Sequence, residues 1–498
     1  MSTGYLDNYY ARLGISKRAT ITEIRKAYHQ AARRLHPDTN QDAGATELFL
    51  QIQEAYEILS DEGKRATYDR SLPEDIDPPV DVMVNAIYSR GVLPMIDKPQ
   101  LVYVLLDLMS MPTKEEYTAV ANPPLNLSLV LDTSTSMKGA RLDMVKATAV
   151  ELVRQLKPQD ILSVVAFDDR AEVIVPATRG LDYKRIESRI GLLSTRGGTE
   201  IFMGLDTAVS EVNRNLSTAY LNHIILITDG RTYGDEADCL NLAEQASQRG
   251  ITINGIGIGD AWNDEFMDEL TRMTGGTSLY AQRAKDIKTL LEKQFRGISQ
   301  TYANRVKLEF ETAADVELRY AFRLSPEVGS LSNNSPIAIG NLPLGPRLSI
   351  IMEFIVNSVG EDIDSLCLLD GTLRLDIPTR AIPQTSCRVS LSRPTGLNPE
   401  LEPPPQMLIK AMSRLSLYRM QEQARKDLAN GEVEKATQRL QNLATQLLVS
   451  GEPGLAQTVM LEVKSIQNGG SLNGEAEKQI KYGTRALLLP SGMEERQL

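Results

Sequence analysis

Five oxygen-bearing side chains in the middle of the chain could together bind a metal ion: Asp132, Ser134, Ser136, Thr199 and Asp229. The first three begin directly after the apolar run at 125–131, the fourth follows a Gly-Gly pair, and the fifth begins directly after the apolar run at 223–228. Two carboxylates and three hydroxyls are hard oxygen ligands with no Cys or His among them, which favours Mg²⁺, Mn²⁺ or Ca²⁺ over Zn²⁺. With so few charges in the set, we expect a bound ion to accept one more oxygen from outside the chain.

Strands and helices in alternation are needed to bring these side chains together. Four near-continuous apolar runs predict strands that are buried on both faces: 125–131, 161–167, 223–228 and 252–258. Amphipathic patterns predict the helices between them: 141–156, 201–213, 238–249 and 264–274. The alternation indicates a doubly wound, Rossmann-like α/β domain with a parallel sheet, whose sites lie beyond the carboxyl ends of the strands. The five side chains fall at that edge.

This pattern resembles the von Willebrand factor A (VWFA) domain over about residues 124–297, and we place its limits at 123–298. The DxSxS element at 132–136, with the distal Thr199 and Asp229, matches the family's metal-ion-dependent adhesion site (MIDAS). The resemblance implies that the hydroxyls contact the metal directly or through water, and that the two aspartates act mostly through water. It also implies that a Glu or Asp carboxylate of a protein partner completes the octahedron.

Covalent chemistry is not favoured, and we predict no catalytic residues. The sequence has three histidines, and His223, which opens a buried strand, is expected to be structural. No Ser/His/Asp or Cys/His set is evident, and DTSTS has Ser134 where the DxDxT of phosphotransferases has its second Asp. The glycines at 255, 257 and 259 have GxGxG spacing without a following GxxG, so close strand packing explains them better than nucleotide binding.

The first seventy residues predict a helical unit. A short helix is expected at 5–13, a second helix follows the capping box Thr20–Glu23, and a third is expected at 46–59. The second helix presents a basic outer face: Arg25, Lys26, Arg33 and Arg34. The loop between the two longer helices contains His36, Pro37 and Asp38.

These segments resemble the J-domain of DnaJ-type co-chaperones, and we place its limits at 1–72. The resemblance implies that the basic face docks on the nucleotide-binding domain of a DnaK-type ATPase chaperone. It implies that the His36-Pro37-Asp38 loop couples docking to ATP hydrolysis, with Asp38 engaging an arginine of the chaperone. His29-Gln30 departs from the family, which is usually basic there. No Gly/Phe-rich stretch or Cys repeat follows Arg70, so we expect a compact, stand-alone J-domain on an unrelated body.

Alternating apolar residues at 80–110, and again from residue 305, predict antiparallel strands, with a Pro/Gly-rich turn at 340–346. The strands of the first segment are too few to bury a core alone. Our hypothesis is one antiparallel β-sandwich built from 80–122 and 300–396, with the A domain inserted into it.

A C-terminal α-helical hairpin or bundle is predicted over 403–468. One of its apolar stripes lies at Leu440, Leu443, Ala444, Leu447 and Leu448. Residues 469–498 are expected to be a linker and a tail, with 468–477 as the linker and 482–490 docking back on the body.

Composition narrows the class of protein. The 498 residues carry 54 basic and 65 acidic side chains, a net charge of −11, and 5% are aromatic, so a nucleic-acid partner is not favoured. The cysteines at 239, 367 and 387 are too scattered for a disulfide framework. No secretory signal is evident and no apolar run spans a membrane, so we expect a cytoplasmic protein without a membrane partner.

These features predict an adaptor that is not itself an enzyme. Its J-domain would recruit and stimulate a DnaK-type ATPase chaperone, and its A domain would bind an acidic residue of a protein partner through Mg²⁺. An alternative is a metal-dependent scaffold for assembly or signalling in which the J-domain only tethers. A more distant alternative is a Mg²⁺-dependent hydrolase.

Overall fold

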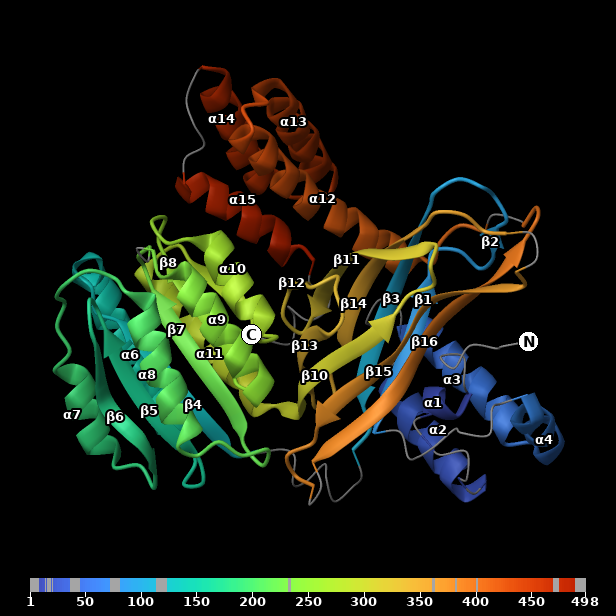
Figure 1. Ribbon diagram of the computed structural model, residues 1–498, viewed down its shortest axis with the longest axis horizontal. Coiled ribbons are helices and arrows are strands. Elements are labelled where there is room, and N and C mark those ends of the chain that lie inside the picture. The colour runs from blue at the N-terminus through green and yellow to red at the C-terminus, as the bar shows by residue number, and fades with distance from the viewer. Residues whose placement is uncertain are drawn as a thin grey trace.

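A computed structural model gives the architecture of the chain. It describes residues 9–13, 15, 19, 21–35, 45–71, 81–112, 123–231, 234–360, 363–380, 383–399, 402–468 and 474–488. The chain has four parts: N-terminal helices, a central β-sandwich, an α/β domain and C-terminal helices (Figure 1). This multidomain class is the one that the sequence predicts.

The N-terminal helical unit contains α1 (Tyr9–Leu13), α2 (Ile21–Leu35), α3 (Ala45–Leu59) and α4 (Glu62–Ser71). Helices α2 and α3 pack together, and the rings of Tyr28 and Tyr56 stack with their centroids 4.2 Å apart. The fourth helix was not predicted, and it ends at Ser71, within the limits 1–72 that we place on this unit.

The N-terminal unit does not stand alone, which corrects our expectation. Met83 and Met109, from the paired strands β1 (Val82–Tyr88) and β3 (Gln100–Ser110), belong to the same apolar core as Tyr10, Leu13 and Ile24. The first four residues of β1 are all buried, where strict alternation predicts that every second one is exposed. The outer face of this sheet is therefore buried at Met83 and Met109 because the helices cover it.

The β-sandwich has two five-stranded sheets with the orders β1-β3-β14-β11-β12 and β13-β10-β15-β16-β2. Its other strands are β2 (Leu93–Pro94), β10 (Thr301–Glu311), β11 (Val316–Ser325), β12 (Gly329–Leu331), β13 (Ile337–Pro343), β14 (Leu348–Val356), β15 (Ser365–Asp376) and β16 (Gln384–Gly396). Strand β3 pairs antiparallel with β14, with Leu106 opposite Ile350. Strands from before and after the α/β domain therefore share one sheet and one core.

The turn predicted at 340–346 is wrong in its first half, because residues up to Pro343 belong to β13. A Cβ on Gly340 would lie 2.4 Å from the carbonyl oxygen of Gly275, and Gly340 has a φ of 107°. This glycine thus permits close approach of the sandwich to the α/β domain and does not form a turn.

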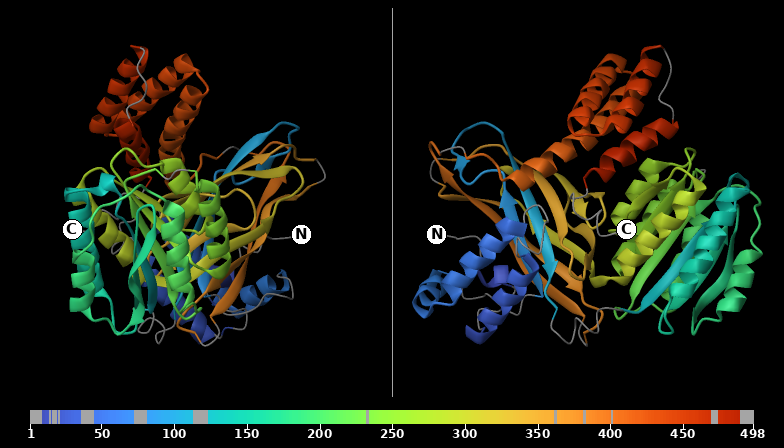
Figure 2. Two further views of the ribbon diagram at one scale, coloured as in Figure 1. Left: turned by 60° about the vertical axis from the view of Figure 1, so that its left-hand side comes forward. Right: turned by 180° about the vertical axis from the view of Figure 1, so that it is seen from behind.

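The α/β domain has a six-stranded sheet of order β6-β5-β4-β7-β8-β9 with helices on both faces (Figure 2). Its strands are β4 (Leu125–Asp132), β5 (Ile161–Phe167), β6 (Ala171–Arg179), β7 (Leu221–Thr228), β8 (Thr252–Ile258) and β9 (Ser278–Ala281). Its helices are η2 (Thr135–Met137), α6 (Ala140–Gln155), α7 (Tyr183–Gly191), α8 (Ile201–Asn213), α9 (Glu236–Arg249), α10 (Asp264–Met273) and α11 (Ala284–Ser299). The sheet is not entirely parallel as we expected, since the edge strand β6 runs antiparallel to β5.

The C-terminal helices are α12 (Gln406–Ala429), α13 (Val433–Val449), α14 (Pro453–Gln467) and α15 (Gly474–Ala486). Leu408 and Tyr418 of α12 pack on the sandwich beside Phe322, while its later part packs in the bundle (Figure 2). Leu448 is 58% exposed, so the predicted stripe ends at Leu447. Within the described ranges, none of the helices combines the length and apolar composition that a membrane span requires.

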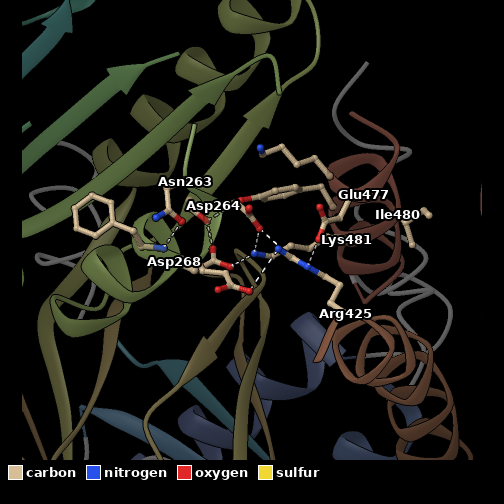
Figure 3. Close-up of polar contacts among 12 residues, drawn as sticks. Asn263, Asp264, Asp268, Arg425, Glu477, Ile480 and Lys481 are labelled. Atoms are coloured by element: carbon tan, nitrogen blue, oxygen red, sulfur yellow. Dashed lines mark hydrogen bonds and ion pairs between the residues drawn. The ribbon is translucent and has the colours of Figure 1, made fainter. Parts of the chain in front are cut away.

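Helix α15 was not predicted, and its first turn lies where we expected a linker. It docks on the α/β domain, in agreement with our expectation for the residues from 482 (Figure 3). Lys481 forms ion pairs with Asp264 and Asp268 of α10, and Arg485 pairs with Asp268 at 2.8 Å. The ring centroid of Tyr482 lies 6.0 Å from that of Trp262 and 5.4 Å from that of Tyr280.

Candidate functional site

The predicted metal ligands lie at the edge of the sheet where its topology changes direction. Asp132 is the last residue of β4, and Asp229 directly follows β7, which pairs in parallel with β4. The chain continues from β4 to β5 on one side of this pair and from β7 to β8 on the other side. The loops that follow β4 and β7 therefore diverge. Such a switch point leaves a crevice in which ligands of α/β sheets bind.

Hydrogen bonds connect four of the five predicted ligands. The Ser136 hydroxyl donates to Oδ1 of Asp229 over 2.5 Å, and the hydroxyls of Ser134 and Ser136 lie 2.9 Å apart. Oδ1 of Asp132 accepts from the backbone N–H of Ser134 over 2.8 Å, and its Oδ2 accepts from the Thr228 hydroxyl over 2.5 Å. The loop after β4 is thus folded back on its own strand and tied to the loop after β7.

Thr199 comes to the same place on a third loop. A Cβ on Gly230 would lie 2.7 Å from Oγ1 of Thr199, which puts this hydroxyl beside the residue that follows Asp229. The backbone N–H of Arg196 donates to the carbonyl of Thr133 over 2.8 Å, which fixes the third loop to the first. The structure therefore brings all five predicted side chains to one edge.

The donor set fits a hard divalent cation. Asp132 and Asp229 are both fully buried, and burial raises the pKa of the Asp132 carboxyl to about 6. A cation between these carboxylates would compensate charge that is costly to bury. Within the described ranges no group of three or more His, Cys, Asp or Glu could hold a metal, and the candidate site is instead a mixed set of two carboxylates and three hydroxyls.

Two contacts of this site were not predicted. Nη1 of Arg141 forms a short ion pair with Oδ2 of Asp229, and Thr228 supports Asp132 through its hydroxyl. Thr228 could have been found from its position beside Asp229 at the end of the apolar run. Nothing in the local pattern distinguishes Arg141 from other exposed helix residues.

The structure also accounts for features that we set aside from chemistry. His223 is buried, its Nε2 lies 3.1 Å from Nδ2 of Asn341, and burial lowers its pKa to about 3. A Cβ on Gly257 would lie 2.0 Å from the Trp262 ring, and one on Gly255 would lie 2.5 Å from Sδ of Met267. The histidine is structural and the two glycines permit close packing.

The predicted chaperone-docking residues are described only in part. Arg25 is exposed on α2. The loop with His36, Pro37 and Asp38 lies outside the described residues, and so do the side chains of the other three basic residues. These three are Lys26, Arg33 and Arg34.

Polar contacts hold α1 and α4 around the N-terminal unit. The Tyr10 hydroxyl donates to Asp69 over 2.6 Å, and Arg12 pairs with Glu54 at 2.6 Å. The first contact joins α1 to α4, and the second joins α1 to α3.

Three family descriptions match the chain. The DnaJ domain matches residues 8–69, the von Willebrand factor type A domain matches 126–293, and the Sll0103-like, C-terminal alpha-helical domain matches 406–490. The chain therefore contains a J-domain and a von Willebrand factor A domain. The first supports a DnaK co-chaperone role and the second supports protein interaction, and neither is an enzyme family.

Curated relatives each match a portion of the chain. Uncharacterized protein sll0103 of Synechocystis sp. is 31% identical over 230 residues, 45% of this chain and 54% of the relative. Uncharacterized protein YfbK of Escherichia coli is 25% identical over 255 residues, 49% of this chain and 44% of the relative. Chaperone protein DnaJ of Staphylococcus carnosus is 56% identical over 63 residues, 13% of this chain and 17% of the relative. The chain spans about half the length of the first two relatives.

Two solved structures share the fold. A von Willebrand factor type A protein from Catenulispora acidiphila aligns with a TM-score of 0.61 and 15% identity, over 76% of this chain and 89% of its own. The ArnB paralog VWA2 from Sulfolobus acidocaldarius aligns with a TM-score of 0.52 and 16% identity, over 82% of this chain and all of its own. Both alignments extend well beyond the A domain, so the shared fold includes more than the α/β sheet.

Proposed function

We propose that this chain is a cytoplasmic adaptor of a DnaK-type chaperone. Its J-domain recruits and stimulates the ATPase, and its A domain binds a protein partner through a divalent cation, with Mg²⁺ as the expected ion. The observation that carries the proposal is that one chain holds both a J-domain and three converging loops with five oxygen donors. The chain itself carries out no covalent chemistry in this proposal.

The cation would be held by Asp132, Ser134, Ser136, Thr199 and Asp229. When bound, it would supply an electrophilic position for a carboxylate oxygen of the partner. The chain's own contribution is to keep the two carboxylates buried and the hydroxyls of Ser134 and Ser136 side by side.

Chaperone docking would use the basic face of α2 and the loop that follows it. The residues are Arg25, Lys26, Arg33 and Arg34 for the cationic face, with His36, Pro37 and Asp38 for the loop. The basic face would steer the encounter with an acidic surface, and Asp38 would form a charge-assisted hydrogen bond. The identity of 56% to a DnaJ over 63 residues supports this assignment.

The arrangement of the parts is compatible with two simultaneous partners. The N-terminal helices and the α/β domain lie on opposite sides of the β-sandwich (Figure 1). We propose the domain limits 1–72, 80–122 with 300–396, 123–298, 403–468 and 469–498 as units of this adaptor. The sandwich would then act as the spacer that separates the chaperone from the A-domain ligand.

A single-turnover ATPase assay with a purified DnaK-type chaperone tests the co-chaperone role. We expect the wild-type chain to accelerate hydrolysis and His36→Gln to lose the acceleration. Lys64→Gln is the control, because Lys64 is exposed on α4, away from α2 and the loop. If the wild type is no better than His36→Gln but still binds the chaperone, the tethering scaffold is the better description.

Titration calorimetry with Mg²⁺, Mn²⁺ and Ca²⁺ tests the metal site. Asp132→Ala should abolish binding, while Asp206→Ala, which changes an exposed carboxylate on α8, should leave it intact. Retained affinity in Asp132→Ala would place the ion elsewhere. A partner retained from cell extract in Mg²⁺ and released by chelator would identify the A-domain ligand, whereas phosphoester turnover that requires Asp132 and Asp229 would favour the hydrolase.

A further inference from the structure

Arg141 occupies a position that helix energetics disfavour. It is the second residue of α6, which begins at Ala140. The amino end of a helix carries partial positive charge, so a cation in the first turn lowers the stability of the helix. The placement of Arg141 therefore needs a compensating partner nearby.

That partner is a predicted metal ligand. Nη1 of Arg141 pairs with Oδ2 of Asp229, whose side chain is fully buried, and it lies 3.4 Å from the carbonyl of Ser136. The other oxygen of Asp229 accepts the hydroxyl of Ser136. Both oxygens of this carboxylate are therefore engaged, and its charge is balanced by the arginine.

The guanidinium can also leave this position. The Arg141 side chain is 38% exposed, so it lies at the rim of the site and reaches solvent. In the paired position Nη2 of Arg141 lies over Gly259, where a Cβ would be only 2.9 Å away, so the guanidinium is not covered by a side chain at that residue. Release of Asp229 would thus require only a change of side-chain rotamer.

We propose that Arg141 is an internal counter-cation that competes with the divalent cation for Asp229 and thereby sets the metal affinity of the site. This inference rests on the proposed metal site. A divalent ion near Asp229 meets like charge from the guanidinium and must displace it. Arg141 is in this sense a positioning residue, because it acts on the metal site through Asp229.

Mn²⁺ binding to the full-length chain, measured by titration calorimetry without a protein partner, tests the proposal. Arg141→Gln should bind Mn²⁺ about tenfold tighter or more, because a like charge close to the ion is removed. Arg141→Lys should fall between the wild type and Arg141→Gln. Arg154→Gln is the matched control, since it removes the same charge from the other end of α6, where the exposed Arg154 pairs with Glu187.

Thermal unfolding gives a second readout that a purely structural role would not produce. In chelator, Arg141→Gln should melt below the wild type, because Asp229 is left buried without its cation. In Mn²⁺ this difference should disappear or reverse. An equal deficit in both conditions would overturn the proposal.

The outcomes separate this inference from the proposed function. If the wild type binds Mn²⁺ and Arg141→Gln binds equally or more weakly, competition by Arg141 is refuted and the metal site stands. If Arg141→Gln binds Mn²⁺ and the wild type does not, both the metal site and the competition by Arg141 are supported. If neither protein binds Mn²⁺, the metal site and the role of Arg141 both fail.

Discussion

Removal of the Lys481 charge should release helix α15 from the A domain. Lys481 is only 3% exposed, and its Nζ contacts Asp264 and Asp268, the latter at 2.7 Å. Lys481→Met keeps the length of the side chain and removes the ammonium. Each carboxylate then keeps one cation, since Arg425 lies 3.0 Å from Asp264 and Arg485 lies 2.8 Å from Asp268.

The magnitude follows from the burial of this cluster. Loss of one partner from a buried ion pair costs roughly 3–5 kcal/mol. Because an arginine remains beside each aspartate, we expect the lower end, about 3 kcal/mol, which is a change of about 100-fold in an equilibrium constant. Burial opposes the charges on Asp264 and Asp268, yet the neighbouring cations hold the pKa of each carboxyl below its usual range, so Lys481 faces two ionised aspartates.

Hydrogen exchange of the α15 amides measures this opening directly. Protection over 474–486 should fall by about two orders of magnitude in Lys481→Met, while protection in β4 and β7 stays unchanged. The control is Lys435→Met, because Lys435 is 64% exposed and pairs with Glu432 on the surface, where such a pair contributes about 1 kcal/mol or less. Unchanged or increased protection of α15 in Lys481→Met would mean that desolvation of the ammonium cancels its ion pairs, and would refute the reasoning.

Three further perturbations test other parts of the structure. Burial lowers the pKa of His223 to about 3, so below pH 6.5 the free energy of unfolding should fall by up to about 1.4 kcal/mol per pH unit. Urea titrations of His223→Gln should lack this pH-dependent loss of stability. Gly230→Ala should weaken Mg²⁺ binding in calorimetry by displacing the Thr199 hydroxyl, whereas Gly198→Ala, which meets no atom within 4 Å, should not. Arg323→Met should lower the melting temperature measured by calorimetry. The buried guanidinium donates to backbone carbonyls of the sandwich and of the α/β domain, and each carbonyl left without a donor costs roughly 1–3 kcal/mol.

Each of these three predictions has an outcome that would contradict it. The sign of the pH effect follows because unfolded His223 binds a proton that the folded protein excludes, so stability is present above pH 6.5 and is lost on acidification. Identical slopes in wild type and His223→Gln would show that this histidine is solvated. Equal Mg²⁺ affinity in Gly230→Ala and Gly198→Ala would remove Thr199 from the site, and an unchanged melting temperature in Arg323→Met would show that water replaces the guanidinium.

Local pattern was enough to predict much of the α/β domain. Apolar runs of six or seven residues predicted β4, β5, β7 and β8 almost to their ends, because strands buried on both faces must be apolar throughout. The same pattern missed β6, which lies at the edge of the sheet, where only Val175 of the strand is buried. It also missed α7 and β9, which are short.

The predicted metal ligands were within reach of the sequence for a topological reason. Asp132 and Asp229 are far apart in the chain, yet both end strands that pair in parallel, and parallel strands present their carboxyl ends to one edge. The loop at His36, Pro37 and Asp38 was predicted from its motif and lies outside the described residues.

Amino-acid order alone thus determined the classes of the four parts, most of their helices and strands, and the oxygen-rich edge of the sheet. Tertiary structure alone decided that Met83 and Met109 complete the J-domain core, that α15 docks through Lys481, and that Arg141 turns to Asp229. Periodicity and motifs are set by neighbours within a few turns or strand residues, so they appear in any short window of sequence. The choice of partner for a methionine or a charged side chain depends on which distant surface is brought against it, and only the packed chain specifies that surface.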